Sequence, residues 1–395
     1  MKARIKQLAK KYNKQTIEWR RTIHANPELS FEEYQTSQFI QSVLKKEKIS
    51  FTRGWANTGV VATIKGDKKS KKVIALRADI DALPIQEKNK VKYKSKNDGV
   101  MHACGHDVHT ANMLGTAALL NQLKDTFGGT IKIIFQPGEE KLPGGASLLI
   151  KEGILKNPKP DAILALHVHP PLAAGKVGFH PGMYMASADE LFVTVKGVGG
   201  HAALPHECVD PILISANIIT SLQQLVSRKA NPTTPTVLSF GKINSTGGAT
   251  NVIPNEVKLE GTFRTFDEKW RAKAHKEMKK MAEGIAKSMG GSCNFDVRNG
   301  YPFLDNDVSL TNRMQQFAEE YLGKTNVISL PKRMTAEDFA FYSHMIPACF
   351  FRLGTGNKKR GITSGVHTET FNIDESALEL SIGLSTWLAI QELNS

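Results

Sequence analysis

Residues 101–110 contain three histidines, one aspartate and one cysteine within ten positions. Thiolate and imidazole groups are the ligands that borderline-soft divalent metal ions prefer. A single His or Cys is usually a hydrogen-bonded core residue, but five ligand-type side chains this close together favour metal binding over that structural explanation. Cys104 and His106 are separated only by Gly105. Because glycine permits a sharp turn, both side chains can point at one ion.

Three further groups of potential ligands follow predicted strands. Each group comes directly after an apolar run of strand length. A solvated turn would explain one such group, but three together indicate a site, because ligands of parallel α/β sheets bind beyond the carboxyl ends of the strands. The groups are Asp79 and Asp81 after 73–78, Glu139 and Glu140 after 130–135, and His167 and His169 after 162–166.

His367 follows a glycine- and lysine-rich segment. The collected residues offer more ligands than one tetrahedral zinc ion requires: Asp81, Cys104, His106, Glu139, Glu140, His167 and His367. His109 and His169 lie close to them and are expected to be supporting, hydrogen-bonded residues. A closed structural site would not need adjacent carboxylates, so a two-metal catalytic site is the preferred interpretation. Two ions can hold a hydroxide between them, polarise a carbonyl group and stabilise an oxyanion. A carboxylate that binds no metal is then needed as general base, and the pair Glu139-Glu140 offers one residue for each task.

The predicted elements change character at about residue 188. Strands and helices alternate before it, which predicts an α/β fold with a mostly parallel sheet and helices on both faces. Residues 188–299 are predicted to run strand–helix–strand–strand–helix–strand, an order typical of a ferredoxin-like α+β sandwich. The later residues return to alternation. We therefore expect a discontinuous catalytic domain, 1–187 and 300–395, with a ferredoxin-like lid or dimerisation domain inserted at 188–299.

Several acidic residues lie near the starts of predicted helices, which explains them without a role in the site. Glu28 and the pair Glu32-Glu33 lie near the start of a helix predicted over about 31–46, where negative charge is favourable at the positive end of the helix dipole. Asp107 is expected to be the N-cap of a buried helix over 108–123.

The charge composition limits the classes of binding partner that we expect. The chain has 52 lysine and arginine residues and 38 acidic residues, which gives a formal net charge of +14. A positive charge of this size could attract nucleic acid, an anionic surface or an acidic small substrate. The basic residues are scattered, without a basic tail or an aromatic-interleaved RNA-binding strand. We therefore expect no nucleic-acid partner.

The same sequence predicts a cytoplasmic protein. Residues 1–22 lack the apolar core of a signal peptide, and no apolar run reaches membrane-spanning length. The four cysteines have no disulfide-framework spacing, which fits a reducing compartment. We expect no membrane partner.

The motifs jointly resemble the two-metal amidohydrolases and exopeptidases that include aminoacylases, hippurate hydrolases and plant auxin-conjugate hydrolases. The similarity extends along almost the whole chain. It is carried by segments 20–28, 77–84, 102–110, 136–145, 199–205 and 337–339, and by Asn251 and His367.

This resemblance implies a role for each matched residue. Glu139 matches the general base and acid, and Asp81 the carboxylate that orients a ligand or tunes the site. His201 would stabilise the oxyanion, and Asn251 would help to hold the substrate carboxylate or carbonyl. One departure is Thr368-Glu369, where this branch usually has Ser-Pro, so the pocket wall there is expected to differ. The metal ligands would be Cys104, His106, Glu140, His167 and His367.

The predicted activity is metal-dependent hydrolysis of the amide bond of N-acyl amino acids or related small amides, by a metal-bridging hydroxide with Glu139 as general base. Two alternatives stay open: an exopeptidase or dipeptidase of the same superfamily, and a non-catalytic basic binding protein with one structural metal. We expect two divalent ions per chain, zinc or manganese, since thiolate favours softer ions and carboxylates tolerate manganese. The edge of the ferredoxin-like sheet could pair with its twin, so a homodimer or dimer-based oligomer is expected.

Overall fold

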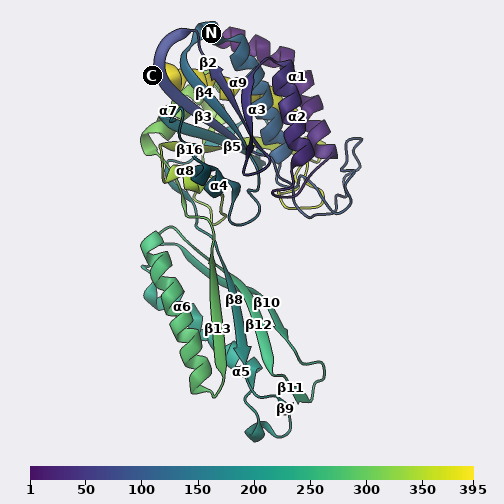
Figure 1. Ribbon diagram of the computed structural model, residues 1–395, viewed down its shortest axis with the longest axis vertical. Helices are drawn as coiled ribbons and strands as arrows, with labels where there is room; N and C mark the ends of the chain where they lie inside the picture. Colours follow the sequence, from purple (N-terminus) through teal and green to yellow (C-terminus); the bar gives the residue numbers. More distant parts are fainter. The chain divides into compact units, whose positions relative to one another are not determined.

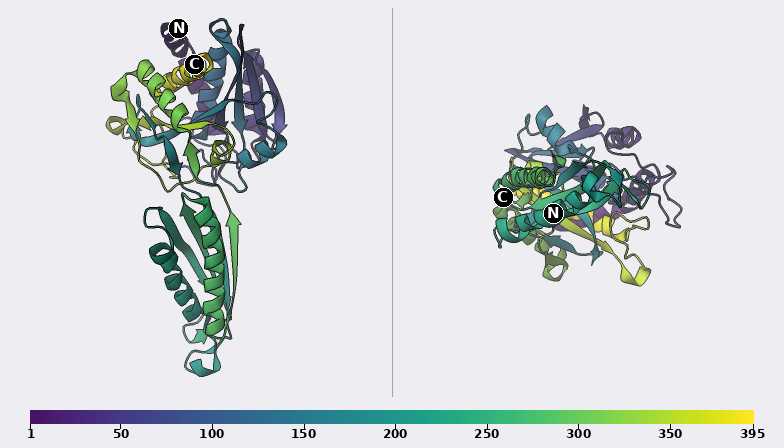
Figure 2. Two further views of the ribbon diagram at one scale, coloured as in Figure 1. Left: turned by 90° about the vertical axis from the view of Figure 1, so that its left-hand side faces the viewer. Right: turned by 90° about the horizontal axis from the view of Figure 1, so that it is seen from below.

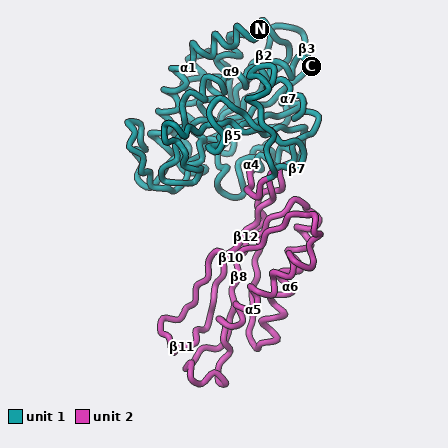
Figure 3. Tube along the Cα trace, turned by 180° about the vertical axis from the view of Figure 1, so that it is seen from behind, with its two compact units in different colours: residues 1–184, 305–332, 338–395 teal, residues 185–304, 333–337 magenta.

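The computed structural model describes residues 1–395, and the chain divides into two compact units (Figure 3). Unit 1 comprises 1–184, 305–332 and 338–395. Unit 2 comprises 185–304 and 333–337. Each unit has its own cluster of buried apolar side chains and is described by itself below.

Unit 1 is built on an eight-stranded sheet in the order β1-β2-β4-β3-β5-β16-β6-β15. Figure 1 labels five of these strands, β2, β3, β4, β5 and β16. Strands β4, β3, β5 and β16 are parallel neighbours, whereas β1, β2 and β6 add antiparallel pairings. The prediction of a mostly parallel sheet is confirmed. The strands are β1 (Ser50–Trp55), β2 (Gly59–Lys65), β3 (Lys68–Asp79), β4 (Gly128–Gln136), β5 (Ala162–Ala173), β6 (Val177–Phe179), β15 (Val327–Ser329) and β16 (Ala348–Gly356).

The central strands of this sheet are apolar because they are covered on both faces. Strand β5 is buried from Ala162 to Pro170. Helix α3 is buried from His106 to Leu120, and it packs on the sheet together with α9, while α1 packs on both helices. The helices of unit 1 are α1 (Lys2–Ala25), α2 (Tyr34–Lys46), α3 (His106–Gln122), α4 (Gly145–Glu152), α7 (Val308–Leu322), α8 (Ala340–Ser343) and α9 (Ser376–Asn394).

Unit 2 contains an antiparallel four-stranded sheet in the order β10-β12-β8-β13. Helices α5 and α6 pack on each other and against this sheet (Figure 2). Asp210 and Asp267 cap these helices by accepting backbone N–H groups of the first turn. The elements are β8 (Asp189–Lys196), β9 (Gly200–His201), α5 (Pro211–Gln224), β10 (Thr236–Ser245), β11 (Val252–Ile253), β12 (Glu256–Thr265), α6 (Glu268–Ser288) and β13 (Ser292–Asn299).

The remaining elements are short. Strands β7 (Gly182–Met185) and β14 (Leu304–Asn306) pair with each other, and β9 pairs with β11. A π-helical turn, Leu225–Lys229, extends α5. No helix of the chain has both the length and the apolar content needed to cross a membrane. Four 3-10 turns lie at Lys124–Thr126, Pro205–Glu207, Lys324–Asn326 and Lys358–Arg360.

Two sequence expectations about helix starts are wrong. Helix α3 begins at His106, with Gly105 at the N-cap position, so Asp107 lies in the first turn and is not the cap. The helix expected from about residue 31 begins at Tyr34, because Phe31 adopts a left-handed backbone with φ of 69°. That conformation cannot continue a right-handed helix.

Candidate metal centre

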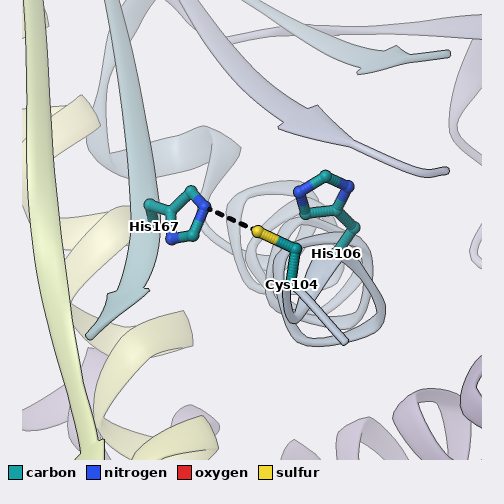
Figure 4. Close-up of side chains that lie close together, drawn as sticks. All are labelled: Cys104, His106 and His167. Carbon is teal, nitrogen blue, oxygen red and sulfur yellow. Dashed lines mark hydrogen bonds between the residues drawn. The ribbon is translucent and has the colours of Figure 1, made fainter. Parts of the chain in front are cut away.

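Three ligand-type side chains meet where α3 begins beside β5. Cys104 precedes the helix, His106 is its first residue, and His167 lies on β5. The Sγ atom of Cys104 lies 3.4 Å from Nε2 of His167 (Figure 4). Gly105 makes the turn with φ of 85°, and a Cβ atom there would approach a methyl group of Val168 to 2.6 Å. The sequence therefore needs glycine between the two potential ligands.

Glu140 and His367 complete the cluster from two other segments. His367 Nε2 lies 3.3 Å from the Cys104 sulfur and 3.2 Å from Oε1 of Glu140. The backbone N–H of His367 donates to Ala103 O at 2.8 Å, which ties the two segments together. The His367 side chain is 52% exposed, whereas Cys104 is buried. The cluster is thus open to solvent on the His367 side.

The free nitrogen and oxygen atoms of this cluster fit bound metal ions. Nε2 of His106 and Oε1 of Glu140 are buried and make no hydrogen bond. They have only ion-pair contacts: Oε1 of Glu140 lies 3.2 Å from His367 Nε2 and 3.9 Å from His106 Nε2. A buried polar atom without a hydrogen bond is costly unless another group satisfies it. The second nitrogen of each buried histidine is occupied: His106 Nδ1 lies 3.1 Å from Asp81 Oδ1, and His167 Nδ1 donates to Val168 O at 2.8 Å. Metal-binding histidines are oriented in this way, with Nε2 left for the ion.

The electrostatics of the cluster also favour a cation. Burial opposes a charged His106, yet Asp79, Asp81 and Glu140 together raise its pKa to about 10. Burial, followed by the charges of Glu140 and Glu139, holds the pKa of Cys104 well above its usual value. Bound divalent ions would reverse this effect and allow the thiolate to form. Two overlapping triads, Cys104–His106–His167 and Cys104–Glu140–His367, each place their ligand atoms within 4.8 Å of one another.

Glu139 lies beside these ligands. Its carboxylate is within 4.8 Å of ligand atoms of His106 and Glu140, and its side chain is buried. Its Oε1 atom accepts the backbone N–H of Asp338 at 3.4 Å. The structure therefore brings together, in unit 1, seven of the nine site residues expected from the sequence: Asp81, Cys104, His106, Glu139, Glu140, His167 and His367.

His201 and Asn251 belong to unit 2, and they are neighbours there. His201 pairs with Val252 in the β9–β11 ladder, and Ala202 N donates to Asn251 O at 2.9 Å. Both side chains are exposed, and His201 Nδ1 accepts the N–H of Ala203 at 3.1 Å.

A buried hydrogen-bonded chain through His109 supports β5 beside His167, and the sequence suggested a hydrogen-bonded role for His109 without revealing its partners. Asp79 Oδ1 pairs with His109 Nδ1 at 2.5 Å, and His109 Nε2 accepts the N–H of Val168 at 2.9 Å. Arg77 joins Asp79 to Asp338, with 2.6 Å to each carboxylate. The alternation Arg77-x-Asp79 on a buried strand was the available signal, since charged groups are rarely buried unless they are paired.

A second buried network lies on the other side of the α3 start. Arg20 Nε donates to Asp107 Oδ2 at 2.7 Å, and His24 Nδ1 lies 2.8 Å from the same oxygen. His24 Nε2 is 3.2 Å from Glu87. Although burial opposes ionisation, Arg20 and then His24 lower the pKa of Asp107. Asp107 thus fastens α3 to α1 instead of capping its own helix.

Comparison with known proteins decides the family. Residues 75–389 match the model of peptidase family M20/M25/M40. The chain belongs to this family. It is 42% identical to an N-acetyl-L-cysteine deacetylase of Bacillus subtilis, over 92% of this chain and 85% of the relative. It is also 42% identical to an N-acyl-L-amino acid amidohydrolase of Geobacillus stearothermophilus, over 78% of this chain and 82% of the relative.

A solved structure of an M20 relative has the same fold as this chain. The crystal structure of a Bacillus subtilis protein, described as a dinuclear metal-binding peptidase of the M20 family, matches with a TM-score of 0.83 and 36% identity. The match covers 98% of this chain and 99% of the other. The resemblance inferred from the motifs is confirmed, and the chain is an enzyme of the M20 family.

Proposed function

We propose that this M20 enzyme hydrolyses the amide bond of N-acyl amino acids or related small amides, using two divalent metal ions. One observation carries the proposal: a thiol, three imidazoles and a carboxylate from separate segments converge, and two of their buried atoms lack hydrogen-bond partners. The names of the relatives, which describe removal of acyl groups from amino acids, supply the substrate class.

In this proposal each residue of the cluster has a separate task. Cys104, His106, Glu140, His167 and His367 hold the metal ions, and Asp81 orients His106 through Nδ1. Two divalent ions bound there would polarise the scissile carbonyl and lower the pKa of water. Glu139 takes a proton from the attacking water and delivers it to the leaving amine. The Asp338 N–H, 3.4 Å from Glu139 Oε1, helps to hold that carboxylate in place.

Unit 2 would provide the remaining contacts. Its strand order and paired helices support a ferredoxin-like insert, which we propose acts as a lid or dimerisation domain. Residues 188–299, which lie within unit 2, would form this domain, and 1–187 with 300–395 the catalytic one, except that 185–187, 300–304 and 333–337 also belong to unit 2. His201 would stabilise the oxyanion, and Asn251 would hold the substrate carboxylate or carbonyl. Pairing of sheet edges would give a homodimer.

Two attributes of the proposal rest on ligand chemistry and composition. The thiolate favours zinc and the carboxylates accept manganese, so we propose zinc or manganese as the metal. The absence of a disulfide-framework spacing supports a cytoplasmic location.

The test is a substrate comparison on protein loaded separately with zinc and with manganese. We expect hydrolysis of N-acetyl and N-benzoyl amino acids with kcat/KM at least tenfold above that for unblocked dipeptides. A clear preference for dipeptides would replace the amidohydrolase with an exopeptidase. No hydrolysis with either metal would leave a binding protein and contradict the proposed function.

A further inference from the structure

A buried carboxylate of unit 1, Glu33, has no task in the proposed mechanism. Glu33 precedes α2, but unlike Glu28 it does not cap that helix. Glu28 accepts the N–H groups of Gln35 and Thr36 at 3.0 and 2.8 Å, as expected of an acid at a helix start. Glu33 is fully buried and points elsewhere.

The partners of Glu33 lie in the segment that carries the general base. Oε1 of Glu33 accepts the N–H of Gly138 at 2.9 Å, and also the N–H of Phe31 at 2.9 Å. Oε2 accepts the hydroxyl of Thr58 at 2.6 Å. One oxygen thus joins residues 31 and 138, and the other anchors the carboxyl group to the turn before β2.

Asp81 makes the matching contact on the other side of Glu139. Its Oδ2 atom accepts the N–H of Glu140 at 2.9 Å and the hydroxyl of Ser30 at 2.6 Å. The peptide N–H groups before and after Glu139 are therefore each held by a buried carboxyl group. Ser30, which donates to Asp81, and Glu33, which accepts from Gly138, belong to the same short segment, so one segment takes part in both contacts.

Packing in this region leaves the segment little freedom. Gly138 has φ of 63°, and a Cβ atom there would meet the Phe31 ring at 2.3 Å. Phe31 itself has φ of 69°, in the left-handed region that bulky residues rarely adopt. Such strain persists where the surroundings enforce it, often at functional sites. Oε1 of Glu33 bonds the N–H groups of both residues and so links the left-handed Phe31 to Gly138, whose carbonyl also accepts the N–H of Gly145.

We propose that Glu33 is a positioning residue, which fixes the Gly138 peptide next to Glu139 and so orients the Glu139 carboxylate toward the proton that it transfers. This inference rests on the proposed role of Glu139 as general base. The hydrogen bonds of the Glu33 carboxyl group go to Phe31, Thr58 and Gly138, none of them a metal ligand, and the N–H of Glu140 stays bound to Asp81. Loss of Glu33 should therefore lower kcat while KM and metal content stay nearly unchanged. A misplacement of about 1 Å can cost roughly 100-fold in rate.

The variants separate positioning from stability. In Glu33→Ala, we expect kcat per metal-loaded chain to fall about 10- to 100-fold, with KM within about twofold of wild type. Glu33→Gln should retain most of kcat, because its amide oxygen can still accept the Gly138 N–H. Glu28→Ala is the matched control: it removes a carboxylate that holds only α2, so it should lower the melting temperature and leave kcat unchanged.

Three results would overturn the inference: wild-type kcat in Glu33→Ala, loss of metal in that variant, or an equal loss of kcat in Glu28→Ala. If Glu33→Ala does not fold, Glu33→Asp decides, because the shorter side chain withdraws the acceptor from Gly138. Its kcat should lie below that of Glu33→Gln, and equal values would contradict positioning.

A crystal structure of metal-loaded Glu33→Ala, or of Glu33→Asp, supplies a readout that needs no substrate. We expect residues 138 and 139 to be displaced or less ordered than in Glu28→Ala, while Glu140, whose N–H is held by Asp81, and the other four metal ligands stay in place. An unmoved segment would refute the inference even if wild-type protein hydrolysed no N-acyl amino acid. Absence of hydrolysis by wild type would instead count against the proposed function alone.

Discussion

At the scale of single residues, adjacent side chains in this site have different surroundings. Glu140 places a buried oxygen without hydrogen-bond partner 3.2 Å from His367 Nε2. Glu139 instead accepts the N–H of Asp338. Adjacent carboxylates with such different contacts can divide metal binding and proton transfer between them. The two tasks can therefore be separated by mutation.

Replacing Glu139 by Gln removes the proton acceptor while keeping the size and shape of the side chain. We expect kcat to fall by about 10²- to 10⁴-fold, the usual contribution of general acid–base catalysis. The metal content should remain at the wild-type value. Steady-state kinetics and mass-spectrometric metal counting on the same sample test this, and a variant with substantial turnover would exclude Glu139 as the base.

Replacing Cys104 by Ser removes the one soft ligand of the cluster. Because even residues that support a metal ligand contribute about 10- to 100-fold in affinity, we expect metal affinity to fall at least tenfold. Cys208→Ser is the control, since that cysteine lies in unit 2, with its thiol 3.6 Å from Leu204 O. Competition with a chelator measures both variants, and equal affinities would show that Cys104 binds no metal.

At the scale of elements, the sequence predicts the strands and helices, because these depend on the local pattern of apolar and polar residues. Apolar runs that end in Asp, Glu or His indicated strands whose carboxyl ends meet, and the structure has β3, β4 and β5 as parallel neighbours. The roles of Asp107 and Glu33 could not be predicted, because their partners Arg20 and Gly138 lie 87 and 105 residues away. Local rules for helix starts were therefore wrong about Asp107 as an N-cap, and for Glu33, which does precede α2, they did not reveal the contact with Gly138.

The turn into α3 gives a prediction at this scale. Gly105→Ala should destabilise unit 1 and weaken metal binding, since the added methyl group meets Val168 and displaces Cys104 or His106. Gly99→Ala is the matched control: Gly99 also has a positive φ, 73°, but no atom lies within 4 Å of its added Cβ.

Both variants incur the left-handed backbone cost of about 1–2 kcal/mol, and only Gly105→Ala should also lose metal affinity. Thermal melting with chelator titration compares them. Equal metal affinity in the two would mean that the turn is not required for the site.

At the scale of the whole molecule, the chain has two separate apolar cores, one in each compact unit. The larger unit buries its ionisable groups in networks, and the smaller one contains the exposed His201 and Asn251. Burial of paired charges makes the stability of unit 1 depend on pH. Glu33 contributes in a direction unusual for a carboxyl group: burial and then the charge of Asp81 raise its pKa to about 7.

A raised carboxyl pKa means that the fold favours the neutral form. Its contribution to stability is complete below about pH 4.5 and is lost as pH rises through 7. Between pH 4 and pH 8, the free energy of unfolding of metal-free wild type should therefore fall relative to Glu33→Gln, by up to about 3 kcal/mol. Urea unfolding of both proteins across this range tests the sign. A constant difference would show that Glu33 does not titrate there.

The central claim is that one cluster in unit 1 holds two catalytic metal ions. Native mass spectrometry of protein reconstituted with zinc or manganese measures this most directly. We predict two ions per chain, with fewer retained in Cys104→Ser under the same conditions. A single ion per chain would contradict the two-metal site, and two ions held equally well by the Cys104→Ser variant would exclude Cys104 as one of its ligands.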